Sequence, residues 1–160
     1  MSVVKYALTH SRRHFVAASV TDGVDDGYFQ YLIFANVSPV LLEYSEWANG
    51  GPPFGGGLKS WSERASGFNL DKVTTPVRIL ARDPNSLLCE WEWFAGLTRL
   101  HKPVELVYLQ SGAHILQRPW ERMVSQQGNV DWFAFWLKGE EDHDLSKAAQ
   151  YARWREMRTR

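Results

Sequence analysis

Asp83 and His114 are the two residues whose types and positions could carry out acid–base chemistry. Each comes shortly after an apolar segment, Asp83 after "RILAR" and His114 a short turn after "VELVYL". A carboxylate that binds one imidazole nitrogen fixes the tautomer of the ring and stabilises the imidazolium, so the other nitrogen can take the proton of a nucleophile. A single histidine after a strand commonly has only a structural role. The functional interpretation therefore requires that the fold bring these two residues together.

The segments around Asp83 and His114 are predicted to alternate between strand and helix. Residues 77–80 form an apolar run that ends near Asp83-Pro84, where the X-Pro bond favours extended geometry for Asp83. Residues 86–100 carry apolar side chains at intervals of three and four, which predicts a helix that covers a core. The segment "KPVELVYL" is the next predicted strand. This order predicts an α/β fold, a parallel sheet with flanking helices.

The predicted topology brings the two candidate residues to one edge of the sheet. Parallel strands that are joined by a right-handed helical crossover end at the same edge, and ligands in such folds bind beyond it. Asp83 ends one predicted strand, and His114 follows Leu109, the predicted end of the other. If the strands are neighbours, at a spacing of about 4.8 Å, a hydrogen bond between Asp83 and His114 is geometrically accessible. The sequence therefore predicts an acid and a base that meet at this edge.

The remaining elements are predicted from shorter patterns. The first residues suit a short helix, and "FVAASV", residues 15–20, is a compact apolar run closed by the turn "TDG". Helices and a glycine-rich loop fill the middle third. A helix in "GNVDWFAFWLKG" is expected to turn Val130, Phe133, Trp136 and Leu137 inward, and a last, exposed helix follows it. We expect a single unit over residues 1–160, with a helical tail at 139–160.

Composition indicates a globular domain and argues against several classes of function. A chain of 160 residues can bury about two thirds of its unfolded surface, and the 44% apolar content supports a core. Eighteen Lys and Arg balance eighteen Asp and Glu, so no charge excess indicates nucleic-acid binding. Cys89 is the only cysteine, which excludes an intrachain disulfide and a cysteine-based zinc cluster. No apolar run is long enough for a membrane span.

Two further motifs have simple explanations. "GGPPFGGG" lacks the Lys-Ser/Thr ending of a phosphate-binding loop and does not follow a strand, so it is interpreted as a flexible loop. Asp22, Asp25 and Asp26 lie in "TDGVDDG", which lacks the spacing and the downstream glutamate of a calcium loop, so they are interpreted as turn residues. We therefore expect no metal and no cofactor.

The order of these features resembles a known enzyme family. The segment "TPVRILARDPNSLLCEWEWFAGLTRLHKPVELVYLQSGAH", followed by "DWFAFWL", is similar to the C-terminal half of the catalytic domain of prolyl oligopeptidase family serine peptidases, which have the α/β-hydrolase fold. The resemblance covers about residues 15–138, most of the chain. It implies that Asp83 is the acid and His114 the base of a catalytic triad, and that the full-length protein acts on a peptide substrate.

The third member of that triad, the serine, has no counterpart in the sequence. In this fold the chain order is serine, acid, histidine, and the serine lies in a Gly-x-Ser-x-Gly turn between strand and helix. The 160 residues contain no such turn. The opening "MSVVKYALTHSRRHFVAASV" is similar to the helix after that turn and the next strand, so we expect the turn upstream of Met1. Ser2 is interpreted as a helix-start residue and Ser111 as a turn former.

The expected function is that of the C-terminal half of a serine hydrolase, most closely a prolyl oligopeptidase-type peptidase. It supplies the acid and the histidine but not the serine, and is expected to be inactive alone. Two alternatives stay open: a fragment of an esterase-type α/β hydrolase, and a non-catalytic remnant or binding module of the same fold. In the resembled architecture the serine-bearing strand pairs with residues 15–20, so the chain alone is expected to expose an apolar sheet edge and to self-associate through it.

Overall fold

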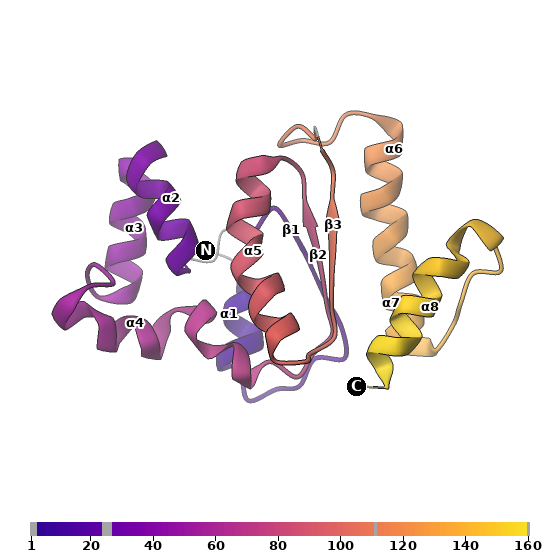
Figure 1. The fold of residues 1–160 in the computed structure, drawn as a ribbon, viewed down its shortest axis with the longest axis horizontal. Coiled ribbons are helices and arrows are strands. Elements are labelled where there is room, and N and C mark those ends of the chain that lie inside the picture. Colours follow the sequence, from indigo (N-terminus) through magenta and orange to yellow (C-terminus); the bar gives the residue numbers. More distant parts are fainter. Residues whose placement is uncertain (1–2, 24–26, 111, 160) are drawn as a thin grey trace.

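A three-stranded parallel sheet lies at the centre of the computed structural model, which describes residues 3–23, 27–110 and 112–159. Helices pack on both faces of the sheet, and Figure 1 shows the sheet between two helical layers. The strands, in their spatial order, are β1 (Ala18–Thr21), β2 (Val77–Ala81) and β3 (Val104–Tyr108). The predicted α/β class, a parallel sheet with flanking helices, is confirmed.

Helices α1 (Val3–His10) and α5 (Pro84–Arg99) cover one face of the sheet. Alternate residues of each strand point to this face, as the pleat of a strand requires. The buried apolar cluster that they form with the two helices includes Leu8, Ala18, Val20, Val77, Ile79, Trp93, Leu97 and Val104. Burial of each large side chain in such a cluster stabilises the fold by roughly 1.5–3 kcal/mol.

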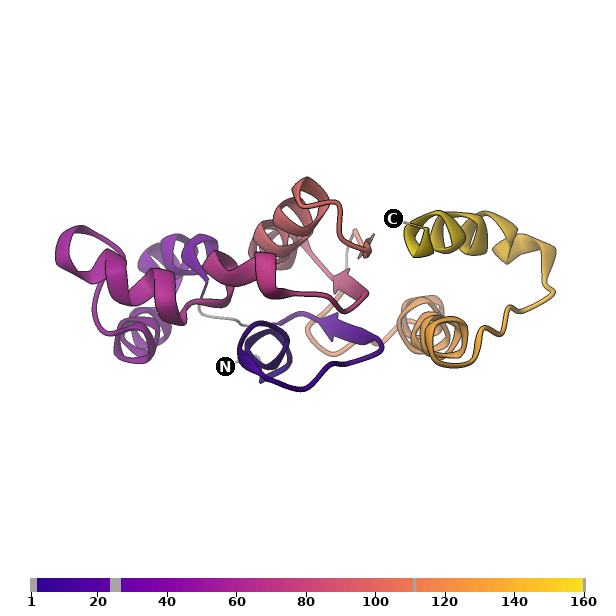
Figure 2. The ribbon, with the colours of Figure 1, turned by 90° about the horizontal axis from the view of Figure 1, so that it is seen from below.

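Helices α7 (Gly128–Lys138) and α8 (Ala148–Arg158) lie on the other face, and Figure 2 shows them side by side. Trp132 and Phe135 of α7 pack against Tyr151 and Trp154 of α8, and all four are buried. The last helix, which was predicted to be exposed, therefore buries two aromatic side chains. Helix α7 continues a helical segment that begins with α6 (Pro119–Arg122) and passes through the π-helical turn η3 (Met123–Gln127).

Helix α7 buries only part of the side that its sequence predicts, since Phe133 and Trp136 are partly buried against the core but Val130 and Leu137 are not. Val130 and Leu137, expected to face inward, are 61% and 56% exposed, whereas Trp132 and Phe135 are buried. The prediction for Val130 and Leu137 is wrong because the partner of α7 was not known. Apolar residues surround much of this helix, and the position of α8 decides which of them become buried.

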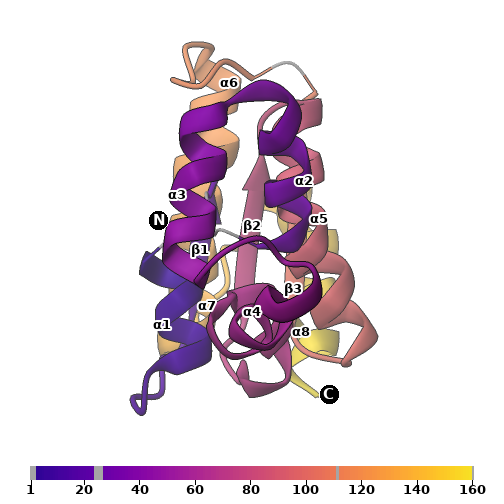
Figure 3. The same cartoon turned by 90° about the vertical axis from the view of Figure 1, so that its left-hand side faces the viewer.

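The middle third of the chain is helical and lies beyond α5, on the side away from α7 and α8 (Figure 3). The two helices predicted before the glycine-rich loop are confirmed, and Ser38 separates them by accepting a hydrogen bond from Leu41 N. Gly50 ends the second helix with a left-handed φ of 80°, a conformation that glycine adopts without strain. The elements of this region are α2 (Tyr28–Val37), α3 (Pro39–Asn49), η1 (Gly55–Gly57), α4 (Leu58–Arg64) and η2 (Ser66–Lys72).

Short turns complete the structure. The 3-10 turn η4 (Leu145–Lys147) leads into α8, and Asp144 caps it by accepting a hydrogen bond from Ser146 N at 2.9 Å.

Across the described ranges, no helix has both the length and the apolar character that crossing a membrane requires.

Candidate active site

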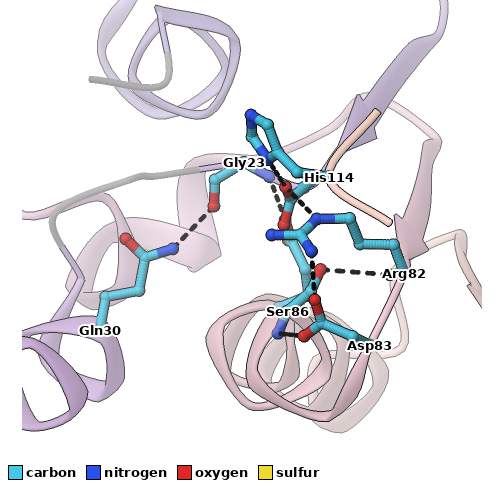
Figure 4. A network of polar contacts seen from close by, with 8 residues as sticks. Gly23, Gln30, Arg82, Asp83, Ser86 and His114 are labelled. Carbon is cyan, nitrogen blue, oxygen red and sulfur yellow. Dashed lines mark hydrogen bonds and ion pairs between the residues drawn. The ribbon is translucent and has the colours of Figure 1, made fainter. Parts of the chain in front are cut away.

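The carboxyl ends of the three strands bring together the polar residues that follow them. Asp22 comes directly after β1, Arg82 and Asp83 come directly after β2, and His114 lies in the loop after β3. Because all three strands are parallel and adjacent, these residues gather at one edge of the sheet, as Figure 4 shows for the labelled Arg82, Asp83 and His114.

His114 binds the carboxylate of Asp22. Its Nδ1 atom lies 3.0 Å from Oδ2 of Asp22. An ionised carboxylate can only accept a hydrogen bond, so Nδ1 is the donor and carries a proton. The His114 side chain is 80% exposed, whereas that of Asp22 is 18% exposed. The carboxylate is therefore held in the protein, and the imidazole projects from it with its Nε2 side accessible.

The loop that carries His114 is tied to the end of β2. Leu109 N donates to Ala81 O, and Gly112 N donates to Arg82 O, both at 2.7 Å. A side chain at position 112 would meet that same carbonyl oxygen, because a Cβ built on Gly112 falls 2.9 Å from Arg82 O. Glycine is therefore required for this close approach, which carries the chain back over the sheet edge towards Asp22.

The backbone around Asp22 is fixed on both sides. Asp22 has a left-handed φ of 51°, which aspartate tolerates better than most residues, and its N–H donates to Leu80 O at 3.1 Å. The next amide, Gly23 N, donates to Oε1 of Glu90 in α5 at 2.6 Å, and Gln30 Nε2 donates to Gly23 O at 2.7 Å. The position of the Asp22 carboxylate is thus set by contacts to β2, α5 and α2.

Arg82 joins the two carboxylates of the site. Its Nε atom donates to Oδ2 of Asp22, and its Nη1 atom donates to Oδ2 of Asp83. The Arg82 side chain is 20% exposed, so part of its charge is shielded from water and the two ion pairs are stronger than pairs on an open surface. One cation therefore holds two aspartates in fixed positions.

Asp83 caps helix α5. Its Oδ1 atom accepts a hydrogen bond from Ser86 N at 2.9 Å, and Pro84 occupies the first turn of the helix, where its missing N–H costs nothing. Both oxygens of Asp83 are engaged, one by the helix and one by Arg82. Among the described residues, no hydrogen bond joins Asp83 to His114. The structure thus brings both predicted residues to one network, linked through Arg82 and Asp22, and their catalytic roles stay predictions.

The environment of Asp22 favours its ionised form. Burial tends to raise the pKa of this carboxyl, but hydrogen bonds from Arg82 and Ser86, the charge of Arg82 and the hydrogen bond from His114 together lower the pKa below its ordinary value. A negative charge is therefore present beside the imidazole at neutral pH.

Sequence reasoning missed Asp22 and Arg82 as site residues. It interpreted Asp22 as a turn residue, although a signal was present, because Asp22 follows the first predicted strand as Asp83 follows the second. Because the carboxyl ends of adjacent parallel strands meet at one edge of the sheet, both residues are expected at that edge. Ser2, Ser111, Asp25 and Asp26, which the sequence also singled out, lie outside the described residues.

No family model matches the chain, but comparison with known proteins finds a similar protein. The chain is 28% identical over 160 residues to lasso peptide isopeptidase AtxE2 of Asticcacaulis excentricus. The chain is similar to a hydrolase. This similarity covers 98% of the chain but only 22% of the relative, so the chain spans about a fifth of the protein that it matches.

Solved structures of the same isopeptidase superimpose on this fold. The apo form gives a TM-score of 0.82 at 26% identity and covers 99% of this chain and 23% of the solved one. A serine-to-alanine variant with Astexin3-dC4 bound gives 0.79 at 29% identity, over 99% and 24% of the two chains. The whole arrangement of sheet and helices is therefore shared with part of a hydrolase.

Proposed function

We propose that residues 1–160 are the C-terminal portion of a serine hydrolase catalytic domain of the prolyl oligopeptidase type, with the segment 139–160 as its helical tail. His114 is the general base. Asp83 is an acidic residue of the same network, linked to His114 through Arg82 and Asp22. The observation that carries the proposal is the imidazole of His114, bound through Nδ1 to a carboxylate at the carboxyl edge of a parallel sheet. The similarity to an isopeptidase along almost the entire chain supports the same class of reaction.

The geometry of His114 suits a general base. Because Nδ1 is engaged by a carboxylate, Nε2 has a free lone pair, and the 80% exposure of the side chain leaves it accessible. In acyl transfer Nε2 takes the hydroxyl proton of the nucleophile as the hydroxyl oxygen attacks the carbonyl carbon, and then gives that proton to the leaving amine. The carboxylate on the other side stabilises the imidazolium between these two steps.

The nucleophile belongs to a segment upstream of Met1. A serine in a Gly-x-Ser-x-Gly turn there would precede α1, and the amide after it would supply half of the oxyanion hole. The solved serine-to-alanine variant of AtxE2 with Astexin3-dC4 bound supports serine chemistry on a peptide substrate for this group of proteins. The 160 residues alone are therefore inactive, and peptide or isopeptide bonds are the substrate class of the longer protein.

The outer edge of β1 fits the strand that would carry this serine. Ala18 N and Asp22 N donate to carbonyls of the β2 region. The amides of Ser19 and Thr21, which alternate with them, point within the plane of the sheet to the other side of β1, away from β2. Beside this edge an open apolar groove of about 370 Å³ lies between α1, β1 and α7, lined by residues that include Val4, Leu8, Phe15, Ala17 and Phe133. A further strand and its apolar side chains would fill both features.

The experiment uses the longer polypeptide that includes the coding sequence immediately upstream of Met1. If that sequence encodes a Gly-x-Ser-x-Gly turn, the longer protein should react with a fluorophosphonate probe at this serine. The His114→Ala variant should lose the reaction by about 10³-fold or more, as expected for removal of a triad member. A longer protein without such a serine, or one whose labelling is unchanged in His114→Ala, would exclude the proposed function and favour a non-catalytic role for the fold.

A further inference from the structure

A polar cavity lies on the face of the sheet that α7 and α8 cover, apart from the carboxyl edge that carries His114. Its volume is about 400 Å³, and it is bounded by β2, β3, the π-helical turn η3, α7, η4 and the start of α8. Arg78 and Glu105, the second residues of β2 and β3, line it from the sheet. Cavities of this size with a few placed polar groups are typical of small-molecule sites.

The positive charge of Arg78 is only partly compensated in this cavity wall. Its Nη1 atom donates to Asn129 Oδ1 at 2.8 Å and its Nη2 atom donates to Val124 O at 2.9 Å, but the buried Nε has no acceptor among the described residues. Oε2 of Glu105 lies 3.7 Å from Nε, too far for a hydrogen bond. Burial lowers the pKa of Arg78, although the charges of Glu105 and Asp131 oppose this lowering. A further negative charge near this guanidinium would therefore be stabilised.

The cavity also offers acceptor oxygens that no donor of the described residues occupies. Oε1 of Glu105 accepts from Arg153 Nη2 at 3.2 Å, whereas Oε2 of Glu105 accepts no hydrogen bond. Gln127 and Gln150 donate through Nε2 to the two carboxylate oxygens of Asp131, at 2.8 and 3.2 Å. Within the described ranges, the amide oxygens of these two glutamines accept no hydrogen bond. A group with several N–H donors, such as an ammonium group, matches these oxygens.

The charges around the cavity favour a ligand that carries both signs. Its lining includes three cationic and three acidic side chains, those of Arg78, Lys147, Arg153, Glu105, Asp131 and Asp144. Because these charges balance, a ligand with a net charge would bring a charge that lacks a partner into a largely buried site, which is costly. A molecule with adjacent positive and negative groups can instead pair with the carboxylate and with the guanidinium groups at the same time.

The apolar part of the lining comes from β3 and from the π-helical turn. Val107, Met123 and Val124 line the same cavity. π-Helical turns are rare and often occur at functional sites. In η3 the turn provides Val124 O to Arg78 and the side chain of Met123 to the cavity. An aliphatic group of a ligand would pack against this side.

We propose that this cavity binds a free α-amino acid with an aliphatic side chain. The ammonium group donates to Oε2 of Glu105 and to the glutamine amide oxygens. The carboxylate accepts from Arg153 and adds negative charge near the buried guanidinium, and the aliphatic group packs against Met123. The site lies apart from His114, so the inference goes beyond the proposed function and does not depend on it.

The first test compares L-leucine with two analogues of the same aliphatic chain, isocaproate, which lacks the ammonium group, and isoamylamine, which lacks the carboxylate. Isothermal titration calorimetry on the 160-residue chain measures their binding. Leucine should bind with a Kd of about 1 mM or lower, and each analogue at least about 10-fold more weakly, because each leaves one set of partners unpaired. No binding of leucine at about 10 mM, or equal binding of either analogue, would overturn the proposal.

Arg153 and Arg155 provide a matched pair of variants. Both lie on α8, their side chains are 57% and 56% exposed, and each binds one glutamate, Glu105 and Glu141 respectively. Arg153 lines the cavity, whereas Arg155 does not. Arg153→Gln should weaken leucine binding by about 10-fold or more, and Arg155→Gln should leave it unchanged. Equal losses in both variants, or a loss in neither, would place the ligand elsewhere and overturn the assignment.

The methyl signals of methionine locate the ligand without any substitution. In a chain with ¹³C-labelled methionine methyl groups, leucine should shift the signal of Met123. The signal of Met157, which lines a neighbouring groove between α5, β3 and α8, should stay in place. This measurement decides the question even if Arg153→Gln does not fold. A shift at Met157 without one at Met123, or no shift at either, would refute the site.

Discussion

Lys5 and Glu90 form an ion pair inside the protein, with 2.7 Å between Nζ and Oε2 and no exposure of either side chain. The pair joins α1 to α5 on the face of the sheet that carries the main apolar cluster. Glu90 also accepts the amide of Gly23 through Oε1, one residue after Asp22. The contact that locks two helices together therefore also supports the loop of the candidate site.

Removal of one member of this pair should destabilise the chain strongly. Lys5→Met keeps much of the side-chain volume but leaves the charge of Glu90 buried without its cation, which costs about 3–5 kcal/mol of unfolding free energy. Urea denaturation followed by circular dichroism measures this loss. The double variant Lys5→Met with Glu90→Gln should recover part of it, because no net charge then stays buried; a double variant less stable than Lys5→Met would contradict this account.

The pKa of Asp22 predicts a pH dependence of stability with a defined sign. Because hydrogen bonds and the charge of Arg82 lower this pKa in the folded state, Asp22 stabilises the fold above its unfolded pKa of about 3.9, and this contribution is lost as pH falls through the lower, folded value. Asp22→Asn should be less stable than wild type by about 1–2 kcal/mol at pH 7. The difference should shrink as pH falls below about 4.

The comparison with Asp22→Asn isolates this residue from other acids. Asp142 and Asp144 also have lowered pKa values, the first because Lys147 binds it and the second because it accepts the amide of Ser146. The contributions of Asp142 and Asp144 to the free energy of unfolding are the same in wild type and in Asp22→Asn, so they cancel in the difference. Urea denaturation at a series of pH values provides the data, and a difference that stays constant from neutral to acidic pH would contradict the assigned cause.

The isolated chain should not react with a serine-directed probe. The proposed nucleophile lies upstream of Met1, and His114 alone cannot form an acyl intermediate on a serine that is not aligned with it. Incubation with a fluorophosphonate, followed by intact-mass measurement, should give no specific adduct. Stoichiometric labelling at Ser2 or Ser111 that is lost in His114→Ala would show instead that the 160 residues contain their own nucleophile.

The sequence predicts the fold well where local patterns decide it and poorly where packing decides it. Strands β2 and β3 and helix α5 follow from apolar periodicity and from Asp83-Pro84, so the sheet edge with Asp83 and His114 could be predicted. The carboxylate that contacts His114 could not be predicted, because β1 ends at Asp22 and β2 ends near Asp83, and either could reach the histidine. The choice depends on the path of the loop after β3, which a backbone contact from Gly112 to Arg82 determines.

The buried side of α7 illustrates the same limit. Its apolar residues surround much of the helix, so periodicity alone cannot separate Val130 from Trp132, and only the position of α8 decides between them. The Lys5–Glu90 pair is a further case, because two charged residues far apart in the sequence carry no local signal that they will meet in the core.

The outer edge of β1 should cause the isolated chain to self-associate. The outward amides of Ser19 and Thr21 and the apolar groove beside β1 offer both hydrogen bonds and apolar surface to a second copy. Size exclusion with light scattering should detect oligomers.

Val16→Lys, at an exposed position just before β1, should reduce these oligomers, since charged side chains block pairing at sheet edges. Val40→Lys, at a still more exposed position on α3, is the control and should leave association unchanged. A wild-type chain that remains a cooperatively melting monomer would mean that the edge of β1 is covered in solution, and the proposed pairing of this edge with a serine-bearing strand would lose its support.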